Sequence, residues 1–175
     1  MKPASRLVEV EGLRIAYERA GSGPPLVLLH GALSDSRSWR PQLEELADEF
    51  TVIAWDAPGA GMSADPTEPF GLADWADSLA RFLASQEVGP ATILGLSFGG
   101  TLALELYRRH PEAVAALIIA DSYAGWRGSL SADECSERLR RGLGAAEIPP
   151  IELAARWVPE MLSDGARPED RKSVV

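Results

Sequence analysis

Short apolar runs alternate along this chain with stretches of helical spacing, and this alternation constrains the fold more than any other feature of the sequence. Each run is short and almost wholly apolar, as expected for a strand that is buried on both faces. These runs are Leu26–His30, Thr51–Trp55, Ala91–Leu96 and Val114–Ala120. Between them, apolar residues at helical spacing predict amphipathic helices over Trp39–Phe50, Leu72–Gln86 and Gly99–His110. Strands that alternate with such helices favour βαβ units, and therefore an α/β fold with a mostly parallel sheet and helices on both faces.

The amino-terminal segment differs from these runs because its apolar residues alternate with polar ones. Leu7–Val10 and Leu13–Arg19 flank the turn pair Glu11-Gly12, which predicts a β-hairpin at the solvated edge of the sheet. Residues 1–122 are therefore predicted to form an α/β core that carries this hairpin at one edge.

The pattern changes after residue 121, and residues 123–175 are predicted to be a helical segment. Helix starts and stops follow known capping chemistry, in which Ser, Asp and Glu favour the first turn and Gly the end. The signals are a capping box at Ser131–Glu134, a stop at Gly142 or Gly144, a start at Pro150 with an interruption at Pro159, and a start at Arg167–Asp170.

Composition excludes several classes of protein. A net charge of −9 argues against a nucleic-acid surface, which needs clustered Lys and Arg. Nowhere do about 18 apolar residues run together, and no apolar signal core follows Lys2, so we expect a cytoplasmic protein without a membrane partner. The single Cys135 can form neither an internal disulfide nor a cysteine-based zinc site, and we expect no metal or organic cofactor.

The motif Gly95-Leu-Ser-Phe-Gly99 lies where a predicted buried strand meets a predicted helix. A G-x-S-x-G element in this position places its serine on a sharp, strained turn that exposes the hydroxyl above the sheet. The glycines beside Ser97 suit such a turn, because strand and helix backbones approach too closely there for larger side chains. Ser97 is therefore the candidate nucleophile, and the amide of Phe98 is a candidate donor to a substrate oxyanion.

A second element, His30-Gly31-Ala32, follows another buried strand. An oxyanion hole needs two convergent donors, and the amide of Ala32 is a natural second one. The alternative interpretation is that Gly31 only makes the turn after the strand.

These motifs resemble those of one known family. His30-Gly31, the loop Asp56-Ala-Pro-Gly-Ala-Gly-Met-Ser63 and Gly95-Leu-Ser-Phe-Gly-Gly100 occur in the order and spacing typical of the α/β-hydrolase superfamily, in its esterase, lactonase, C–C hydrolase and perhydrolase branch. The resemblance covers residues 5–122, through the sixth strand. It implies that the last two strands are missing and that residues 123–175 are the beginning of a helical cap.

The resemblance implies a Ser nucleophile, which Ser97 matches, an acid after strand seven or sometimes six, and a His after strand eight. The chain stops before those last strands, so neither usual partner of Ser97 is expected in it. Asp121, after the sixth strand, is a weak candidate for a displaced acid, or it caps a turn. The other titratable candidates are expected to be structural or inert: His30 in the oxyanion turn, His110 at a helix end, Asp56 in a loop and Cys135 on a cap helix.

The expected reaction is hydrolysis of an ester, lactone or thioester with apolar flanks. A Ser instead of an Asp at position 97, in the strained turn, excludes the carboxylate nucleophile of haloalkane dehalogenases. Candidates to line an apolar pocket, or simply to pack in the core, are Trp39, Met62, Phe98 and Trp126. A non-catalytic module that binds a ligand or a protein is the alternative function. A nucleotide-binding domain is excluded, because no G-x-G-x-x-G or P-loop follows the first buried strand.

The predicted sixth strand, Val114–Ala120, contains neither Pro nor a charged residue. Without a seventh strand its outer backbone groups would lack partners, and such an edge invites pairing with another chain. We therefore expect self-association, or a partner that supplies strands, at this edge.

Overall fold

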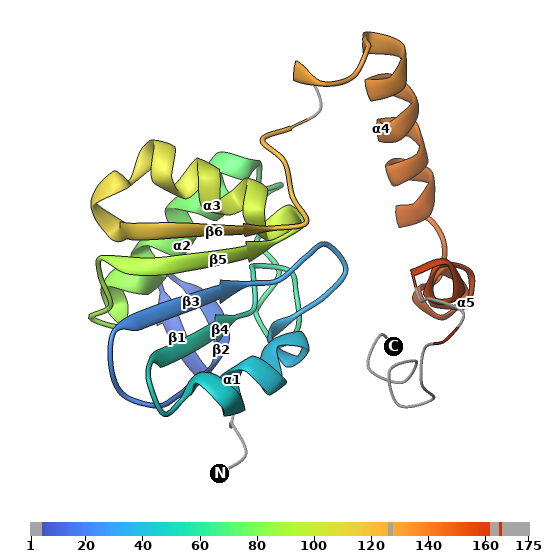
Figure 1. Cartoon of the computed structure of the whole chain (residues 1–175). Coiled ribbons are helices and arrows are strands. Elements are labelled where there is room, and N and C mark those ends of the chain that lie inside the picture. Colours follow the sequence, from blue (N-terminus) through green and yellow to red (C-terminus); the bar gives the residue numbers. More distant parts are fainter. Residues whose placement is uncertain (1–4, 126–127, 162–164, 166–175) are drawn as a thin grey trace. The chain divides into compact units, whose positions relative to one another are not determined.

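The structure is a computed structural model that describes residues 5–125, 128–161 and 165. It divides into two compact units, residues 1–124 and residues 125–175. The first unit contains a sheet of six strands in the order β1-β2-β4-β3-β5-β6 (Figure 1). The strands are β1 (Ser5–Val10), β2 (Leu13–Ala20), β3 (Pro25–Leu29), β4 (Thr51–Trp55), β5 (Ala91–Leu96) and β6 (Val114–Ala120).

The pairing of the strands confirms the predicted mixed sheet. β1 and β2 form the antiparallel hairpin, with the turn residues Glu11 and Gly12 at φ values of 49° and 80°. Two positive φ angles in succession match the right-handed twist of a tight hairpin. β2 also pairs antiparallel with β4, whereas β4, β3, β5 and β6 run parallel to one another. The sheet is therefore mostly parallel, as the alternation of strands and helices predicts.

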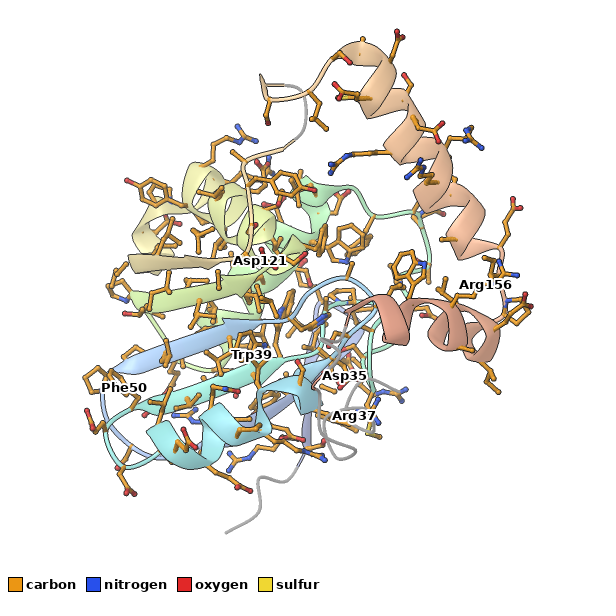
Figure 2. All side chains as sticks on the ribbon, turned by 45° about the vertical axis from the view of Figure 1, so that its right-hand side comes forward. Asp35, Arg37, Trp39, Phe50, Asp121 and Arg156 are labelled. Atoms are coloured by element: carbon orange, nitrogen blue, oxygen red, sulfur yellow. The ribbon has the colours of Figure 1, made fainter. Side chains whose placement is uncertain are left out.

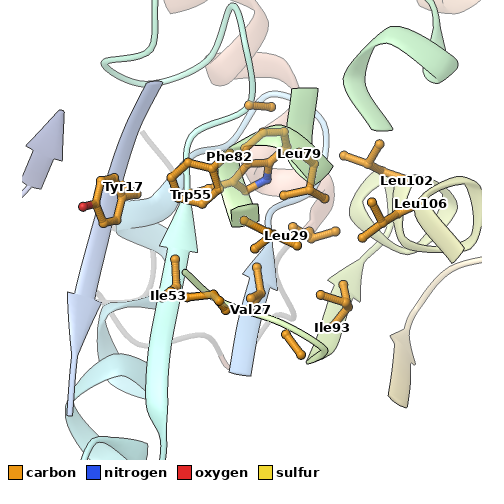
Figure 3. Packing of buried hydrophobic residues seen from close by; sticks show 14 of the residues in the cluster. Tyr17, Val27, Leu29, Ile53, Trp55, Leu79, Phe82, Ile93, Leu102 and Leu106 are labelled. Atoms are coloured by element: carbon orange, nitrogen blue, oxygen red, sulfur yellow. The ribbon is translucent and has the colours of Figure 1, made fainter. Parts of the chain in front are cut away.

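Helices cover both faces of this sheet (Figure 1). The helices α2 (Leu72–Ser85) and α3 (Phe98–Arg109) cover one face, and α1 (Arg40–Leu46), preceded by the 3-10 turn η1 (Ser36–Trp39), covers the other. Alternate strand residues face the two layers: Val27 packs with α2 and α3, whereas Leu28 packs with α1. Figure 3 shows the larger cluster, in which Trp55 and Phe82 lie 6.1 Å apart between ring centroids. Each such buried side chain contributes about 1.5–3 kcal/mol.

The helix predicted over Trp39–Phe50 is shorter in the structure, where α1 ends at Leu46. The reason is tertiary. A Cβ atom at Gly21 would overlap the carbonyl oxygens of Ala47 and Phe50, so the chain after α1 passes directly against the strand end at Gly21. This close contact turns the backbone at the end of α1, although the helical spacing of apolar residues continues to Phe50.

A buried ion pair attaches the start of α1 to the sheet. Glu18 on β2 is fully buried, and it accepts hydrogen bonds from Nη2 of Arg40 on Oε1 at 2.8 Å and from Nε of Arg40 on Oε2 at 3.3 Å. The bidentate geometry suits a guanidinium and a carboxylate. The ion pair thereby fixes the start of α1, where the segment that follows β3 ends, to β2.

β6 lies at the edge of the described part of the sheet, where its only strand partner is β5. Its Ile118 and Ile119 are 46% and 38% exposed, although the sequence is as apolar as that of the wholly buried β4. Pairing of this edge with a second chain or with further strands stays a prediction.

The second unit contains α4 (Ala132–Ala146) and α5 (Pro150–Met161). Ser131 caps α4 as predicted: its hydroxyl accepts from the Glu134 amide, and its own amide donates to the Glu134 carboxylate. α4 ends at Ala146, near the stop predicted around Gly142 or Gly144. The predicted interruption at Pro159 was wrong, because α5 continues to Met161. The predicted start at 167–170 lies outside the described residues, among which no helix is long and apolar enough to cross a membrane.

Candidate active site

Ser97 occupies the turn between β5 and α3, with φ 52° and ψ −116°. A non-glycine residue in this region stores backbone strain of about 1–3 kcal/mol, which the surrounding structure must hold in place. Two hydrogen bonds do so: the Ser97 amide donates to the carbonyl of Ala120 at 3.0 Å, and the Ser122 hydroxyl donates to the Ser97 carbonyl. The Ser97 residue itself is exposed. The local conformation is therefore the one that the motif predicts.

Glycines make this turn possible. A Cβ atom at Gly95 would overlap the backbone of Gly99, and one at Gly99 would overlap the carbonyl of Leu29 at the end of β3. A Cβ at Gly100 would overlap the Ser122 side chain. The start of α3 can therefore lie against the carboxyl ends of both β5 and β3.

The close approach of α3 to β3 brings the loop after β3 beside Ser97. A Cβ atom at Gly31 would lie 3.6 Å from Cβ of Ser97, at ordinary contact distance. Ala32 follows in this loop and is exposed. Phe98 is the first residue of α3, so its amide is one of those that have no acceptor within the helix. The two amides that the sequence nominates as oxyanion donors thus belong to segments that meet at Ser97, and their role stays a prediction.

Both ring nitrogens of His30 are engaged by backbone groups. Nε2 lies 3.1 Å from the amide nitrogen of Ala57, and Nδ1 lies 2.8 Å from the carbonyl oxygen of Gly31. An amide can only donate and a carbonyl can only accept, so the ring is neutral with its proton on Nδ1. His30 therefore holds the turn together, in keeping with the structural place expected for it.

The carboxylate of Asp56 also bridges two loops. It is 3% exposed, its Oδ1 accepts from the amide of Ser36 at 2.7 Å, and its Oδ2 accepts from the amide of Met62 at 2.8 Å. Ser36 ends the loop that begins at His30, whereas Met62 belongs to the loop after β4.

Asp35, next to Ser36, pairs with Arg37 on the surface (Figure 2), and this guanidinium lowers the pKa of the Asp35 carboxyl.

The other histidine lies far from Ser97. His110 follows the last residue of α3, and a helix of 12 residues is about 18 Å long. Its Nε2 lies 2.7 Å from Oδ1 of Asp77 on α2, and Arg109 binds the same carboxylate at 2.8 and 2.6 Å. The hydrogen bonds from Arg109, and then from His110, hold the pKa of Asp77 well below its ordinary value.

The remaining predicted residues are placed as follows. Asp121 is exposed directly after β6 with φ 44°, one residue beyond the carbonyl that accepts from Ser97 (Figure 2). Cys135 lies on α4, in the second unit. Among the described residues, no group of three or more His, Cys, Asp or Glu side chains could hold a metal ion.

The pocket candidates fare differently. Trp39 is buried in the core layer under α1, so it packs there, and its Nε1 is a buried donor without a partner among the described residues. Met62 is 61% exposed. Trp126 lies outside the described residues.

Sequence reasoning missed an aromatic cluster beside Ser97. Trp75 on α2 meets Phe98 edge to face at 5.4 Å and Phe70 at 6.5 Å between ring centroids. Its Nε1 donates to the carbonyl of Pro58 at 3.2 Å, in the loop after β4. Helical spacing alone placed Trp75 on the buried stripe of its helix. A tryptophan near the start of the helix predicted over Leu72–Gln86 was the available signal.

The geometry of this site can be compared with known proteins. The sequence profile of the α/β hydrolase fold family matches residues 24–142, more than half of the chain. The chain belongs to this family.

Two relatives illustrate how far the likeness of this α/β hydrolase chain extends. A 2-(acetamidomethylene)succinate hydrolase of Mesorhizobium japonicum is 30% identical over 93% of this chain and 59% of its own length. An uncharacterized protein of Mycobacterium tuberculosis is 34% identical over 69% of this chain and 35% of its own length.

Among solved structures, a thermophilic esterase from Thermogutta terrifontis superposes with a TM-score of 0.82 at 27% identity, over 98% of this chain and 65% of the esterase. An N-acyl homoserine lactonase, 24% identical with a TM-score of 0.77, shares the fold. The chain thus spans only part of the length of the proteins that it matches.

Proposed function

We propose that this chain carries the nucleophile and the oxyanion-binding half of a serine hydrolase. The substrate class is an ester, lactone or thioester with apolar flanks. The observation that carries the proposal is the conformation of Ser97: an exposed serine at φ 52° between β5 and α3, with the loop of Gly31 beside it. Strain of this kind at an exposed polar residue is typical of a functional turn. The esterase and hydrolase names among the relatives support the same class.

The proposed chemistry proceeds in two steps. Oγ of Ser97 attacks the carbonyl carbon and its proton passes to a base. The oxyanion that forms accepts hydrogen bonds from the amides of Ala32 and Phe98. Collapse breaks the bond to the leaving group, which takes a proton, and water then hydrolyses the acyl-enzyme. An apolar acyl or alkyl group would lie against the cluster of Trp75 and Phe98.

The base is not one of the two histidines of this chain. His30 is held by two backbone groups, and His110 lies at the opposite end of α3. We propose that the acid and base belong to a further part of the protein.

The test is the Ser97→Ala variant of the full-length protein, assayed on short p-nitrophenyl esters and by labelling with a fluorophosphonate. We expect the loss of both signals with an unchanged circular dichroism spectrum. Ser85→Ala is the matched control and should keep both signals, because it removes a hydroxyl at the end of α2 that bonds only to the Phe82 carbonyl and the Gln86 side chain. Full turnover in a folded Ser97→Ala variant would rule out the nucleophile. Absence of turnover and of labelling in the unaltered protein would favour a non-catalytic binding module.

A further inference from the structure

We propose that Asp56 is a positioning residue that fixes the oxyanion loop beside Ser97. Its carboxylate holds the far end of the loop that carries Ala32, and it neither touches substrate nor transfers a proton. This proposal rests on the proposed function for its kinetic consequence. The restraint on the loop is a separate structural claim that does not depend on the function.

The oxyanion loop, residues 31–35, is attached at both ends to two consecutive residues that follow β4. At its start, the His30 ring accepts the amide hydrogen of Ala57. At its end, the amide of Ser36 donates to Oδ1 of Asp56 at 2.7 Å. Five residues between two fixed points have little freedom, and the Ala32 amide lies among them. Loss of either attachment leaves this loop held at one end only.

The second carboxylate oxygen of Asp56 stabilises the loop after β4, to which Asp56 belongs. Oδ2 accepts from the amide of Met62 at 2.8 Å, which folds the loop after β4 back over the carboxylate. A Cβ atom at Gly61, whose φ is +54°, would overlap Oδ2. Ser63 then closes the loop, because its hydroxyl donates to the Asp56 carbonyl at 2.7 Å and accepts from the Ala16 amide at 2.9 Å.

The partners of Asp56 show why a carboxylate is needed. Both oxygens face amide N–H donors, and a carboxylate is the side chain that offers only acceptors on both atoms. An asparagine in the same place must turn its own NH₂ group toward one of the two amides, which breaks that hydrogen bond and opposes two donors. Hydrogen bonds to a charged acceptor are about twice as strong as neutral ones.

The expected consequence is a loss in kcat. A displacement of about 1 Å in a catalytic group can cost about 10²-fold, and removal of one oxyanion donor about 10²–10³-fold. Asp56→Asn should therefore lower kcat by about 10²-fold with KM within about threefold, because ground-state binding does not depend on the oxyanion hole. Affinity for a trifluoromethyl ketone analogue, which forms an oxyanion on Ser97, should fall with kcat/KM.

The variants are compared in the full-length protein. Asp77→Asn is the matched control, since it removes a carboxylate of an ion-pair network at the other end of α3 and should leave kcat within about twofold. Gly61→Ala is the second variant, because its Cβ displaces the same carboxylate without changing its charge. Gly61→Ala replaces Asp56→Asn in the same measurements if Asp56→Asn does not fold.

A readout without activity separates this proposal from the proposed function. Hydrogen exchange of the Ser36 and Met62 amides should accelerate about tenfold or more in Asp56→Asn and remain unchanged in Asp77→Asn, whether or not Ser97 is a nucleophile. Unchanged exchange, or a kcat within threefold of the unaltered protein, overturns the positioning role. Faster exchange together with full activity in Ser97→Ala instead refutes the proposed function and leaves the restraint on the loop intact.

Discussion

The two ends of α3 carry different sets of polar residues, and only one end is a candidate site. At the amino-terminal end, Ser97 stands in a strained turn beside the oxyanion loop, without a histidine free to act as its base. At the other end, about 18 Å away, His110 and Asp77 form a close pair with Arg109. The difference shows that a serine, a histidine and an aspartate can act together only where the backbone brings their side chains to one place.

The largest expected effect concerns the base, which we propose lies in a further part of the protein. The 175-residue chain by itself should hydrolyse p-nitrophenyl esters at a rate lower by about 10⁶-fold than the full-length protein, because nucleophile and base act as one unit. The measurement is steady-state turnover of both forms at equal concentration. Strong activity of the short chain that disappears in His110→Ala would mean that this histidine serves Ser97.

The second prediction concerns the aromatic cluster at the Ser97 end. Trp75→Ala removes the edge-to-face contact with Phe98, worth about 0.5–1.5 kcal/mol, and the hydrogen bond to Pro58. We expect kcat/KM to fall about tenfold, most for substrates with large apolar acyl groups. Tyr107→Ala, an exposed aromatic near the other end of α3, is the control and should have no effect. An equal loss for acetyl and for longer esters would contradict a role in apolar recognition.

The third prediction tests the far end of α3 as a structural network. Asp77→Asn should lower the free energy of unfolding by about 1 kcal/mol at pH 7, as measured by urea denaturation. The folded-state pKa of Asp77 is lowered by Arg109 and His110, so this stabilisation is present above its ordinary value of 3.8 and is lost as the pH falls below it. The difference in stability between the two proteins should therefore shrink progressively as the pH falls below 3.8 and be smallest at the lowest pH at which the protein stays folded. A constant difference down to that pH would show that Asp77 acts by packing and not by charge.

The smallest expected effect is on catalysis at that same end. His110→Ala in the full-length protein should keep kcat within about twofold, with an unchanged pH profile. A shifted pH profile would indicate that the two ends of α3 are coupled.

Much of the fold was predictable because it depends on local patterns. Apolar runs located the strands to within about a residue at each end, and the glycines around Ser97 predicted a turn that the structure reproduces. The predictions failed where distant segments intervene. α1 is cut short by the crossing near Gly21. For Trp39 the sequence left open a pocket or the core, and the structure places it in the core.

The candidate site was predictable only in part. A motif identified Ser97, and its neighbours nominated the amides of Ala32 and Phe98. The sequence offered no sign that Asp56 would bind the amide of a residue 20 positions earlier in the chain. Trp75 likewise became a neighbour of Phe98 only when α2 packed beside α3.

The sequence by itself determined the strands, the strained turn at Ser97 and the class of fold, because hydrophobic period and glycine placement act over a few neighbouring residues. Only the tertiary structure decided which polar groups meet. It joined His30 to the amide of Ala57 and Asp56 to the amide of Ser36. It also placed His110 with Asp77 at the end of α3 remote from Ser97. Such pairings depend on how the sheet order brings strand ends together, and a sheet neighbour is set by the packing of the whole unit and not by position in the chain.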